Sequence, residues 1–253
     1  MKQGNGMDAK KAEKKITAFI RGYFKSSKKK TAVIGLSGGL DSAATLALCV
    51  RALGRRRVVA VLMPSFSTPA QDMSDAKALA KKLGVKTIFH GIEPALAAFG
   101  ALSSGRLSRA NLSARIRMAI LYSIAQQGNG LVVGTGDKSE FLLGYFTKYG
   151  DGGADLFPIG GLYKTEVRKL ASHLGVPARI ISKPSSPALW GGQTAESELG
   201  FTYEAADVVL AAIGRGETRS AIEKKFGKKI VRAIISRMEK NRHKLIPAPI
   251  CDI

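Results

Sequence analysis

Hydrophobic residues recur along the chain in two alternating patterns. Apolar positions three or four residues apart predict amphipathic helices in four segments, at about Asp8–Phe24, Ser42–Leu53, Asn111–Gln126 and Tyr163–His173. Short apolar runs between them predict buried strands at Thr31–Leu36, Val58–Met63, Val85–Phe89 and Leu131–Val133. Strands that alternate with helices of this length are typical of α/β proteins. We therefore expect a doubly wound parallel sheet flanked by helices.

The remaining segments are predicted from turn residues and composition. A helix is expected to open at Thr68-Pro69, with Thr68 as its cap, and to end at Gly84. The region from about Tyr203 to Lys240 is expected to be helical. Two long stretches lack periodicity and are expected to be functional loops, the second of them a lid: Gly144–Gly161 and Ser182–Gly200. The sequence shows neither linker nor repeat, so residues 8–253 are expected to form a single domain after a disordered tail, residues 1–7.

Composition narrows the classes of function. The chain has 253 residues, enough for one large α/β domain, and 45% of them are hydrophobic. No apolar run approaches the ~18 residues of a membrane helix. No secretory signal is expected, because the basic N-terminus is followed by a polar segment, Asp8 to Lys15. Two cysteines, Cys49 and Cys251, form neither a disulfide framework nor a metal spacing, which favours the reducing cytoplasm.

The charge of the chain is strongly positive. Lysines and arginines number 40 against 19 acidic residues, a formal net charge of +21 that suits polyanionic partners such as nucleic acids or nucleotides. The basic residues gather at helix ends and turns, without the interleaved aromatic residues that stack on bases. We therefore favour a solvated basic surface, and we expect neither a nucleic acid nor a membrane as a partner.

The most informative motif follows the first predicted strand. It is a glycine-rich string at a strand-to-helix turn: Gly35, Leu36, Ser37, Gly38, Gly39, Leu40, Asp41 and Ser42. In open α/β sheets, ligands bind at the carboxyl ends of the strands, where backbone N–H groups and a helix N-terminus attract anions. The glycines let the backbone close around an anion, and the serines can donate hydrogen bonds. Asp41 alone would repel phosphate, so it implies a bridging cation, Mg²⁺.

Three other interpretations compete for this turn. A Walker loop requires a lysine that the string lacks. A hydrolase nucleophile elbow, G-x-S-x-G, fits Gly35–Gly39, but its histidine would have to be His90, His173 or His243. A plain strand-to-helix turn is the third. The full S-G-G-x-D-S string is more specific than the elbow pattern, and it resembles the pyrophosphate-binding loop of the N-type ATP pyrophosphatases.

Further segments resemble one family within that superfamily. Asn111–Met118 is similar to the N-x-x-A-R-x-R-M helix of NAD synthetases. Other segments resemble that family's second nucleotide loop, substrate loop, mobile loop and C-terminal motif: Gly134–Glu140, Gly144–Lys164, Trp190–Glu196 and His243-Lys244. The resemblance extends from about Ile16 to Pro249. It implies a Rossmann-like fold of the adenine nucleotide alpha hydrolase type.

The resemblance also implies an activity. NAD synthetases join ammonia to deamido-NAD: the nicotinate carboxylate attacks the α-phosphate of ATP, an acyl-adenylate forms as pyrophosphate leaves, and ammonia displaces AMP to give NAD⁺. By this resemblance, residues Ser37 to Ser42 hold the pyrophosphate part of ATP, and Asp41 and Glu140 share Mg²⁺. Three more residues are assigned to ATP: Thr135 on the adenosine side, Lys164 at the triphosphate and Ser186 in the mobile loop.

The same resemblance assigns five residues to deamido-NAD: Arg115, Lys148, Asp155, His243 and Lys244. Asp151 is a hypothesised ammonium site that accepts a proton before attack, and we expect it to be catalytic together with Lys164. Plain structural roles compete for three of these residues: a solvated helix position for Arg115, an exposed first-turn position for Lys164, and a turn aspartate beside Gly152-Gly153 for Asp151.

Three further expectations follow. Ala195 and the pair Ser186-Pro187 depart from the family's usual pattern, which bears on how the lid closes. The chain leaves no length for an attached amidase, so free ammonia is the expected donor, and the family's usual homodimer is the expected assembly. An ATP pyrophosphatase that modifies tRNA and a nucleotide-binding protein without activity are the alternatives.

Overall fold

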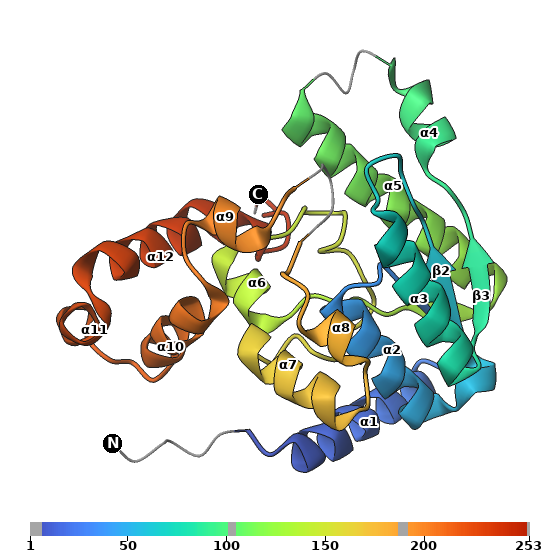
Figure 1. The fold of residues 1–253 in the computed structure, drawn as a ribbon, viewed down its shortest axis with the longest axis horizontal. Helices are drawn as coiled ribbons and strands as arrows, with labels where there is room; N and C mark the ends of the chain where they lie inside the picture. Colours follow the sequence, from blue (N-terminus) through green and yellow to red (C-terminus); the bar gives the residue numbers. More distant parts are fainter. Residues whose placement is uncertain (1–6, 101–104, 187–191, 252–253) are drawn as a thin grey trace.

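Four parallel strands form the central sheet of the computed structural model, which describes residues 7–100, 105–186 and 192–251 (Figure 1). The strand order is β3-β2-β1-β4, with bounds β1 Thr31–Gly35, β2 Val58–Leu62, β3 Lys86–Phe89 and β4 Gly130–Val132. In the register, Ala32 of β1 lies opposite Val58 of β2, and Thr31 lies opposite Gly130 of β4. The order reverses between β1 and β4, which is the switch point where such folds bind ligands.

Helices connect and flank these strands. Those that precede β4 are α1 Ala9–Ser26, α2 Leu40–Leu53, α3 Ala70–Leu83, α4 Glu93–Ala98 and α5 Arg106–Gln127. Those that follow it are α6 Lys138–Leu143, α7 Lys164–His173, α8 Ala178–Ile181, α9 Ala195–Leu199, α10 Tyr203–Gly214, α11 Arg219–Phe226 and α12 Lys228–Asn241. The expected helical region after Tyr203 is therefore confirmed as three helices.

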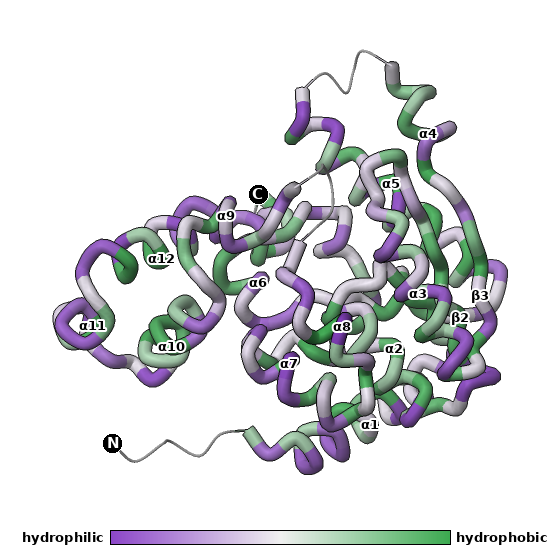
Figure 2. Tube along the Cα trace, viewed as in Figure 1, coloured by the Kyte–Doolittle hydropathy of each residue, from purple (hydrophilic) through white to green (hydrophobic). Residues whose placement is uncertain are grey.

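Side chains on the two faces of the sheet enter separate cores. In β1, Ala32 and Ile34 pack with α1, α2 and α7, whereas Val33 packs with α4 and α5 on the opposite face. Burial of both faces explains why the strands are continuously apolar instead of alternating with polar residues. Figure 2 shows hydrophobic residues along the central elements and hydrophilic residues on outer helices such as α1 and α11. The expected doubly wound sheet flanked by helices is confirmed.

A helical extension of α10, α11 and α12 has a smaller core of its own (Figure 1). Its buried residues include Tyr203, Val209 and Val231, and Leu143 of α6 joins the same core. α10 also contacts α7. The extension therefore packs on the elements that follow the sheet, in keeping with a single α/β domain.

Most predicted elements agree with the structure within a few residues, but two expectations are wrong. Pro69, not Thr68, occupies the N-cap position of α3, which has no side-chain cap, and the Thr68 hydroxyl instead accepts the N–H of Ser65 at 2.9 Å. The second long loop contains a helix, α9, which Thr194 caps. The short helices α4, α6 and α8 were not predicted either.

Two further expectations concern membrane-spanning helices and the N-terminal tail. No helix within the described ranges is long and apolar enough to cross a membrane. The predicted tail falls on residues 1–6, which lie outside the described part, and on Met7, which packs partly buried against the main core.

Candidate active site

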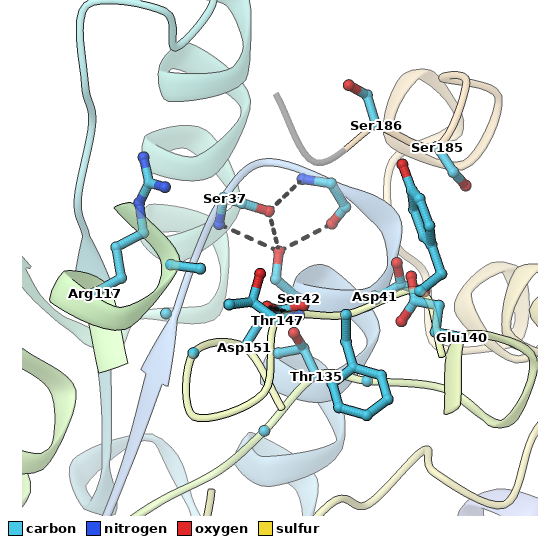
Figure 3. A pocket seen from close by; sticks show the side chains of 18 of the residues that line it. Ser37, Asp41, Ser42, Arg117, Thr135, Glu140, Thr147, Asp151, Ser185 and Ser186 are labelled. Carbon is cyan, nitrogen blue, oxygen red and sulfur yellow. Dashed lines mark hydrogen bonds between the residues drawn. The ribbon is translucent and has the colours of Figure 1, made fainter. Parts of the chain in front are cut away.

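The glycine-rich loop joins β1 to α2 and is held by its own serines (Figure 3). The N–H of Ser37 donates to Ser42 Oγ at 3.3 Å, and the N–H of Gly39 donates to Ser37 Oγ at 3.2 Å. Gly38 has a φ of +82°, and a Cβ there would lie 2.2 Å from the carbonyl oxygen of Asp72. Only glycine therefore fits this position. The first N–H groups of α2 lack partners within the helix, which suits an anion.

A cavity of about 430 Å³ opens over this loop, at the carboxyl ends of β1, β2 and β4. Its wall contains most of the residues assigned to ATP, the assigned ammonium site and one residue assigned to deamido-NAD: Gly35, Leu36, Ser37, Gly39, Leu40, Asp41, Ser42, Thr135, Glu140, Ser186, Asp151 and Lys244. The wall also contains three cationic residues that were not predicted, Arg117, Lys183 and Arg237. The cavity has the size of a small-molecule site.

Lys164, the first residue of α7, is fully buried, so the exposed first-turn interpretation is wrong. Its ammonium lies 2.7 Å from Asp41 Oδ2, 2.9 Å from Glu140 Oε1 and 3.0 Å from Asp137 Oδ2. Asp41 and Glu140 therefore converge, as Figure 3 shows, and the Lys164 ammonium lies between them. One ammonium meets three carboxylates, which leaves an excess of negative charge beside the loop.

Local structure at the start of α6 places two of these carboxylates side by side. The N–H of Glu140 donates to Asp137 Oδ1 at 2.8 Å, and the N–H of Asp137 donates to Glu140 Oε2 at 3.2 Å. This reciprocal pattern is a capping box. Glu140 was predicted from the sequence and Asp137 was missed, although the D-x-x-E spacing before an apolar run was a usable signal.

Burial and crowding perturb the ionisation of this cluster. Burial raises the pKa of Asp137 to about 6, and the charge of Asp41 adds to the effect while Lys164 opposes it. Burial, with the charges of Asp137 and Asp41, also raises the pKa of Glu140 well above its ordinary value. Burial disfavours the Lys164 ammonium, but the three carboxylates outweigh it and raise the pKa of Lys164. The cluster therefore favours uptake of a proton or a cation.

Two residues of α10 hold Lys164 in place, and neither was predicted. Asp207 Oδ1 accepts the hydroxyl of Ser139 at 2.5 Å, and its Oδ2 accepts the N–H of Thr165 at 2.9 Å. The N–H of Lys164 donates to Ser139 Oγ at 2.9 Å. The ring centre of Tyr203 lies 5.1 Å from Lys164 Nζ. The available signal for Asp207 was a carboxylate that interrupts the apolar run from Ala205 to Ile213 of α10.

Asp151 lies in the cavity wall (Figure 3), where it keeps exposed surface while neighbouring groups displace part of its water. Its Oδ1 accepts the N–H of Thr147 at 2.9 Å, and the Thr147 hydroxyl donates to Asn111 Oδ1 at 2.8 Å. Burial raises the pKa of Asp151, although the hydrogen bonds from the loop oppose the shift. Asp151 thus shapes a turn and also faces the cavity, so the geometry fits both interpretations of this residue.

The residues assigned to deamido-NAD fall into two places. Lys148 Nζ donates to the carbonyl of His243 at 3.0 Å, and Lys244 Nζ donates to the carbonyl of Gly144 at 2.7 Å. Arg115 is exposed on α5, and its Nε donates to the carbonyl of Lys148 at 3.3 Å. These contacts bring the substrate loop, α5 and the C-terminal segment together, as the motif resemblance implies.

Asp155 lies apart from that group. Its Oδ2 accepts the N–H of Val132 at 2.7 Å, and its Oδ1 accepts the Tyr122 hydroxyl at 3.4 Å. Tyr122 neighbours Tyr23 of α1, which is 38% exposed, and Phe19 beside it is 48% exposed. The ring centres of Phe19 and Tyr23 are 6.2 Å apart. Asp155 therefore adjoins an exposed aromatic surface, not the cavity.

The segment after α8 contains the two departures from the family pattern. Ser186 lines the cavity, whereas Pro187 and Trp190 lie outside the described residues. Ala195 begins α9 in a buried position, and its N–H donates to the carbonyl of Ser185 at 2.8 Å. A buried carboxylate requires compensating partners, so an alanine suits the apolar core on this side of α9.

The chain is similar to known proteins over almost its whole length. The family model for NAD synthase matches residues 12–248. The chain belongs to the NAD synthase family. It is 46% identical to the NH(3)-dependent NAD(+) synthetase of Pyrobaculum aerophilum, over 98% of this chain and 95% of that protein. It is 47% identical to the enzyme of the same name from Methanosarcina acetivorans, over 98% and 100% of the two chains.

Solved structures with the same fold include other members of the family. An NMN synthetase from Francisella tularensis has a TM-score of 0.87 at 34% identity, over 98% of this chain and 100% of that chain. An NH3-dependent NAD synthetase from Campylobacter jejuni has a TM-score of 0.84 at 34% identity, over 97% and 100%. The resemblance drawn from the motifs is therefore confirmed. The tRNA-modifying alternative finds no support in these comparisons.

Proposed function

We propose that this protein is an ammonia-dependent NAD⁺ synthetase, which uses ATP to amidate deamido-NAD and releases AMP and pyrophosphate. One observation carries the proposal: an anion-binding loop, a carboxylate cluster with excess negative charge and Asp151 all border one cavity. Relatives that are 46% or 47% identical over nearly the whole chain bear the name of the same activity.

The reaction requires two successive transfers. A carboxylate oxygen of the nicotinate ring attacks the α-phosphorus, and the bond to the pyrophosphate oxygen breaks with both electrons on that oxygen. N–H groups and serine hydroxyls of the loop from Ser37 to Ser42 stabilise the departing charge. Ammonia then attacks the acyl carbon and AMP leaves. A cavity that holds both nucleotides in register lowers the entropic cost of each encounter.

Magnesium fits the carboxylate cluster. Asp41 Oδ1 is buried with no hydrogen-bond partner in the part of the chain that the structure describes. Lys164 balances one of three carboxylates, and hard oxygen ligands suit a divalent cation. No group of three acidic, histidine or cysteine side chains among the described residues is arranged to hold a metal alone, so ATP oxygens would complete the shell. Asp41 and Glu140 would hold the ion, which would neutralise triphosphate charge.

The remaining ATP assignments rest on the cavity wall. The loop from Ser37 to Ser42 binds the pyrophosphate part of ATP, Thr135 binds the adenosine side, and Ser186 contacts the nucleotide from the segment after α8. Lys164 acts from behind the wall, where it orients Asp41 and offsets part of its charge. Its direct contact with the triphosphate would require the ammonium to leave the carboxylates.

The deamido-NAD assignments rest on the second group of contacts. Lys244 reaches the cavity, and Lys148, His243 and Arg115 adjoin it through the contacts between the substrate loop and the C-terminal segment. Asp151 accepts a proton from ammonium. Its raised pKa is closer to the pH at which the enzyme works, which suits a general base.

A cytoplasmic homodimer completes the proposal. The exposed rings of Phe19 and Tyr23 form an apolar surface of the kind that partners cover. Dimerisation through this surface would place Asp155 near the subunit boundary, which would reconcile its distance from the cavity with a role in dinucleotide binding. Both cysteines are free thiols, as suits a reducing compartment.

A coupled assay tests the function. The purified protein is incubated with ATP, Mg²⁺ and deamido-NAD, with ammonium or glutamine as separate donors, and NAD⁺, AMP and pyrophosphate are measured. We expect NAD⁺ with ammonium only. Nicotinate mononucleotide serves as a second acceptor, because one solved neighbour is named an NMN synthetase. Faster turnover of that acceptor would change the assigned substrate, and no pyrophosphate with either acceptor would overturn the proposal.

The role of Asp151 is tested in the same assay. Asp151→Asn is expected to raise the KM for ammonia and to flatten the acid limb of the pH profile, because the amide cannot accept the ammonium proton. The KM for ATP serves as the control, since the glycine-rich loop is untouched. An unchanged ammonia KM and pH profile would leave Asp151 as a turn residue only.

A further inference from the structure

A second lysine lies on the other side of the glycine-rich loop. Lys183, which follows α8, has its Nζ 3.3 Å from the carbonyl oxygen of Gly38, 2.7 Å from Asp72 Oδ1 and 3.0 Å from Asp75 Oδ2. Asp75 is also held by Arg179 Nε at 2.7 Å. Lys183 thereby connects three segments: the loop, the first turns of α3 and the segment that leads to Ser186.

The contact with Gly38 bears on the anion-binding face of the loop. The Gly38 carbonyl and the Gly39 N–H belong to one peptide unit, and a planar trans peptide points these two groups in opposite directions. A donor that holds the carbonyl therefore also sets the direction of the Gly39 N–H, which donates to Ser37 Oγ. Glycine backbone is otherwise free to rotate, so Gly38 and Gly39 need such a constraint more than other residues would.

The surroundings of Lys183 keep it in this position. Two cations, Lys183 and Arg179, face two carboxylates, Asp72 and Asp75, so the group is electrically balanced. Burial opposes ionisation of Asp75, but the bonds from Lys183 and Gln71 and the charge of Arg179 lower its pKa. The Lys183 side chain is 25% exposed and lines the cavity.

We propose that Lys183 is a positioning residue for pyrophosphate: its ammonium holds the Gly38 carbonyl and thereby fixes the peptide whose Gly39 N–H donates to Ser37 Oγ, so that the loop keeps the conformation that binds the departing phosphates. The inference rests on the proposed function only in naming pyrophosphate as the ligand of the loop. It assigns to Lys183 a selective effect on the phosphate end of ATP, and none on the binding of deamido-NAD.

Calorimetric titration with inorganic pyrophosphate and Mg²⁺, and separately with deamido-NAD, tests the proposal. Lys183→Met is expected to weaken pyrophosphate binding about 10- to 100-fold, the range for losing one charged hydrogen bond, while deamido-NAD binding stays unchanged. Lys183→Arg keeps the charge and is expected to recover part of the loss. Steady-state kinetics should show the same split, with a raised KM for ATP and an unchanged KM for deamido-NAD.

Lys82→Met is the matched control. Lys82 Nζ also donates to a backbone carbonyl, that of Gly175 at 2.9 Å, but Lys82 lies outside the cavity wall. It should leave pyrophosphate binding unchanged. The proposal is overturned if Lys183→Met binds pyrophosphate as tightly as the wild type, if it weakens both ligands equally, or if the wild type binds no pyrophosphate. Titration needs no turnover, so pyrophosphate binding without NAD⁺ formation would overturn the proposed function alone.

Discussion

Two lysine–carboxylate clusters flank the same glycine-rich loop, and they differ in charge balance. On one side the buried Lys164 faces three carboxylates, those of Asp41, Asp137 and Glu140. On the other side Lys183 and Arg179 face two carboxylates. The first cluster holds excess negative charge around a fully buried lysine, and the second is neutral and its lysine is partly exposed. We call them the Lys164 cluster and the Lys183 cluster.

The difference shows how similar groups can serve opposite purposes. Unbalanced buried charge is unfavourable for folding, because desolvation is not fully compensated. Such charge is retained where a ligand compensates it, as a divalent cation would in the Lys164 cluster. A balanced cluster compensates itself and can act as a structural link, which is the part we assign to the Lys183 cluster. Each experiment below changes one cluster so that the other serves as its reference.

The largest effect is expected from Lys164→Met. This change removes the cation that pairs with all three carboxylates, so the free energy of unfolding near pH 7 should fall by about 3–5 kcal/mol. Urea denaturation measures the change, and Lys169→Met, at an exposed position of the same helix, is the control. A loss below about 1 kcal/mol would mean that Lys164 contributes no more than a surface ion pair does.

Neutralising one carboxylate in each cluster is expected to change the free energy of unfolding in different directions. Asp41→Asn relieves excess negative charge, so the free energy of unfolding should stay level or rise by about 1 kcal/mol. Synthetase activity should nevertheless fall about 100-fold or more, because the proposed cation loses a ligand. Asp72→Asn breaks a balanced pair and should lower the free energy of unfolding by about 1 kcal/mol. Destabilisation of equal size in both variants would remove the distinction between the clusters.

A fall in pH should also affect the two clusters differently, because Asp137 and Asp75 have pKa values shifted in opposite directions. The folded-state pKa of Asp137, about 6, lies above its unfolded value of 3.8, so the folded protein binds the proton more tightly. Lowering the pH from 7 to 5 should therefore stabilise the fold through Asp137 by about 1 kcal/mol. The lowered pKa of Asp75 has the opposite consequence, since its contribution is lost only as the pH falls below the ordinary aspartate value.

Denaturation at pH 7 and pH 5 measures this difference, with Asp137→Asn as the variant that lacks the titrating group. The wild type should gain stability relative to that variant as the pH falls. Magnesium-dependent ATP binding should weaken over the same interval, because protons compete with the cation for the carboxylates. A wild type and a variant with parallel pH dependence would show that Asp137 ionises normally.

The smallest effect is expected from Tyr203→Phe. The Tyr203 hydroxyl is buried with no hydrogen-bond partner among the residues described, so its removal should raise the free energy of unfolding by about 0.5 kcal/mol. The ring that lies over Lys164 is kept. Thermal denaturation measures the change. A clear loss of stability would indicate that the hydroxyl binds an ordered water or ligand.

Local interactions explain why much of the site was predictable. The turn after β1 needs glycine at Gly38 and places serines at fixed steps, so a short string of residues carries the signal. The capping box that joins Asp137 to Glu140 spans four residues and offered an equally local signal, although Asp137 was missed. Sequence spacing is informative here because each partner lies within one turn of the other.

Long-range packing explains what was missed. Lys164 meets Asp41 across 123 positions of the chain, and Asp207 meets Ser139 across 68. Neither contact has a local pattern, and an ordinary first-turn lysine would be solvated. Lys183 was overlooked for the same reason, since its partners in α3 and the glycine-rich loop are more than one hundred positions away.

The amino-acid sequence by itself determined the alternation of strands and helices, the anion-binding turn and the family resemblance, because these depend on neighbouring residues. The tertiary structure alone decided which carboxylates share a lysine, which of those groups is buried, and where Asp155 lies. Charge balance and desolvation belong to the set of groups that packing brings together in space, and no spacing along the chain specifies that set.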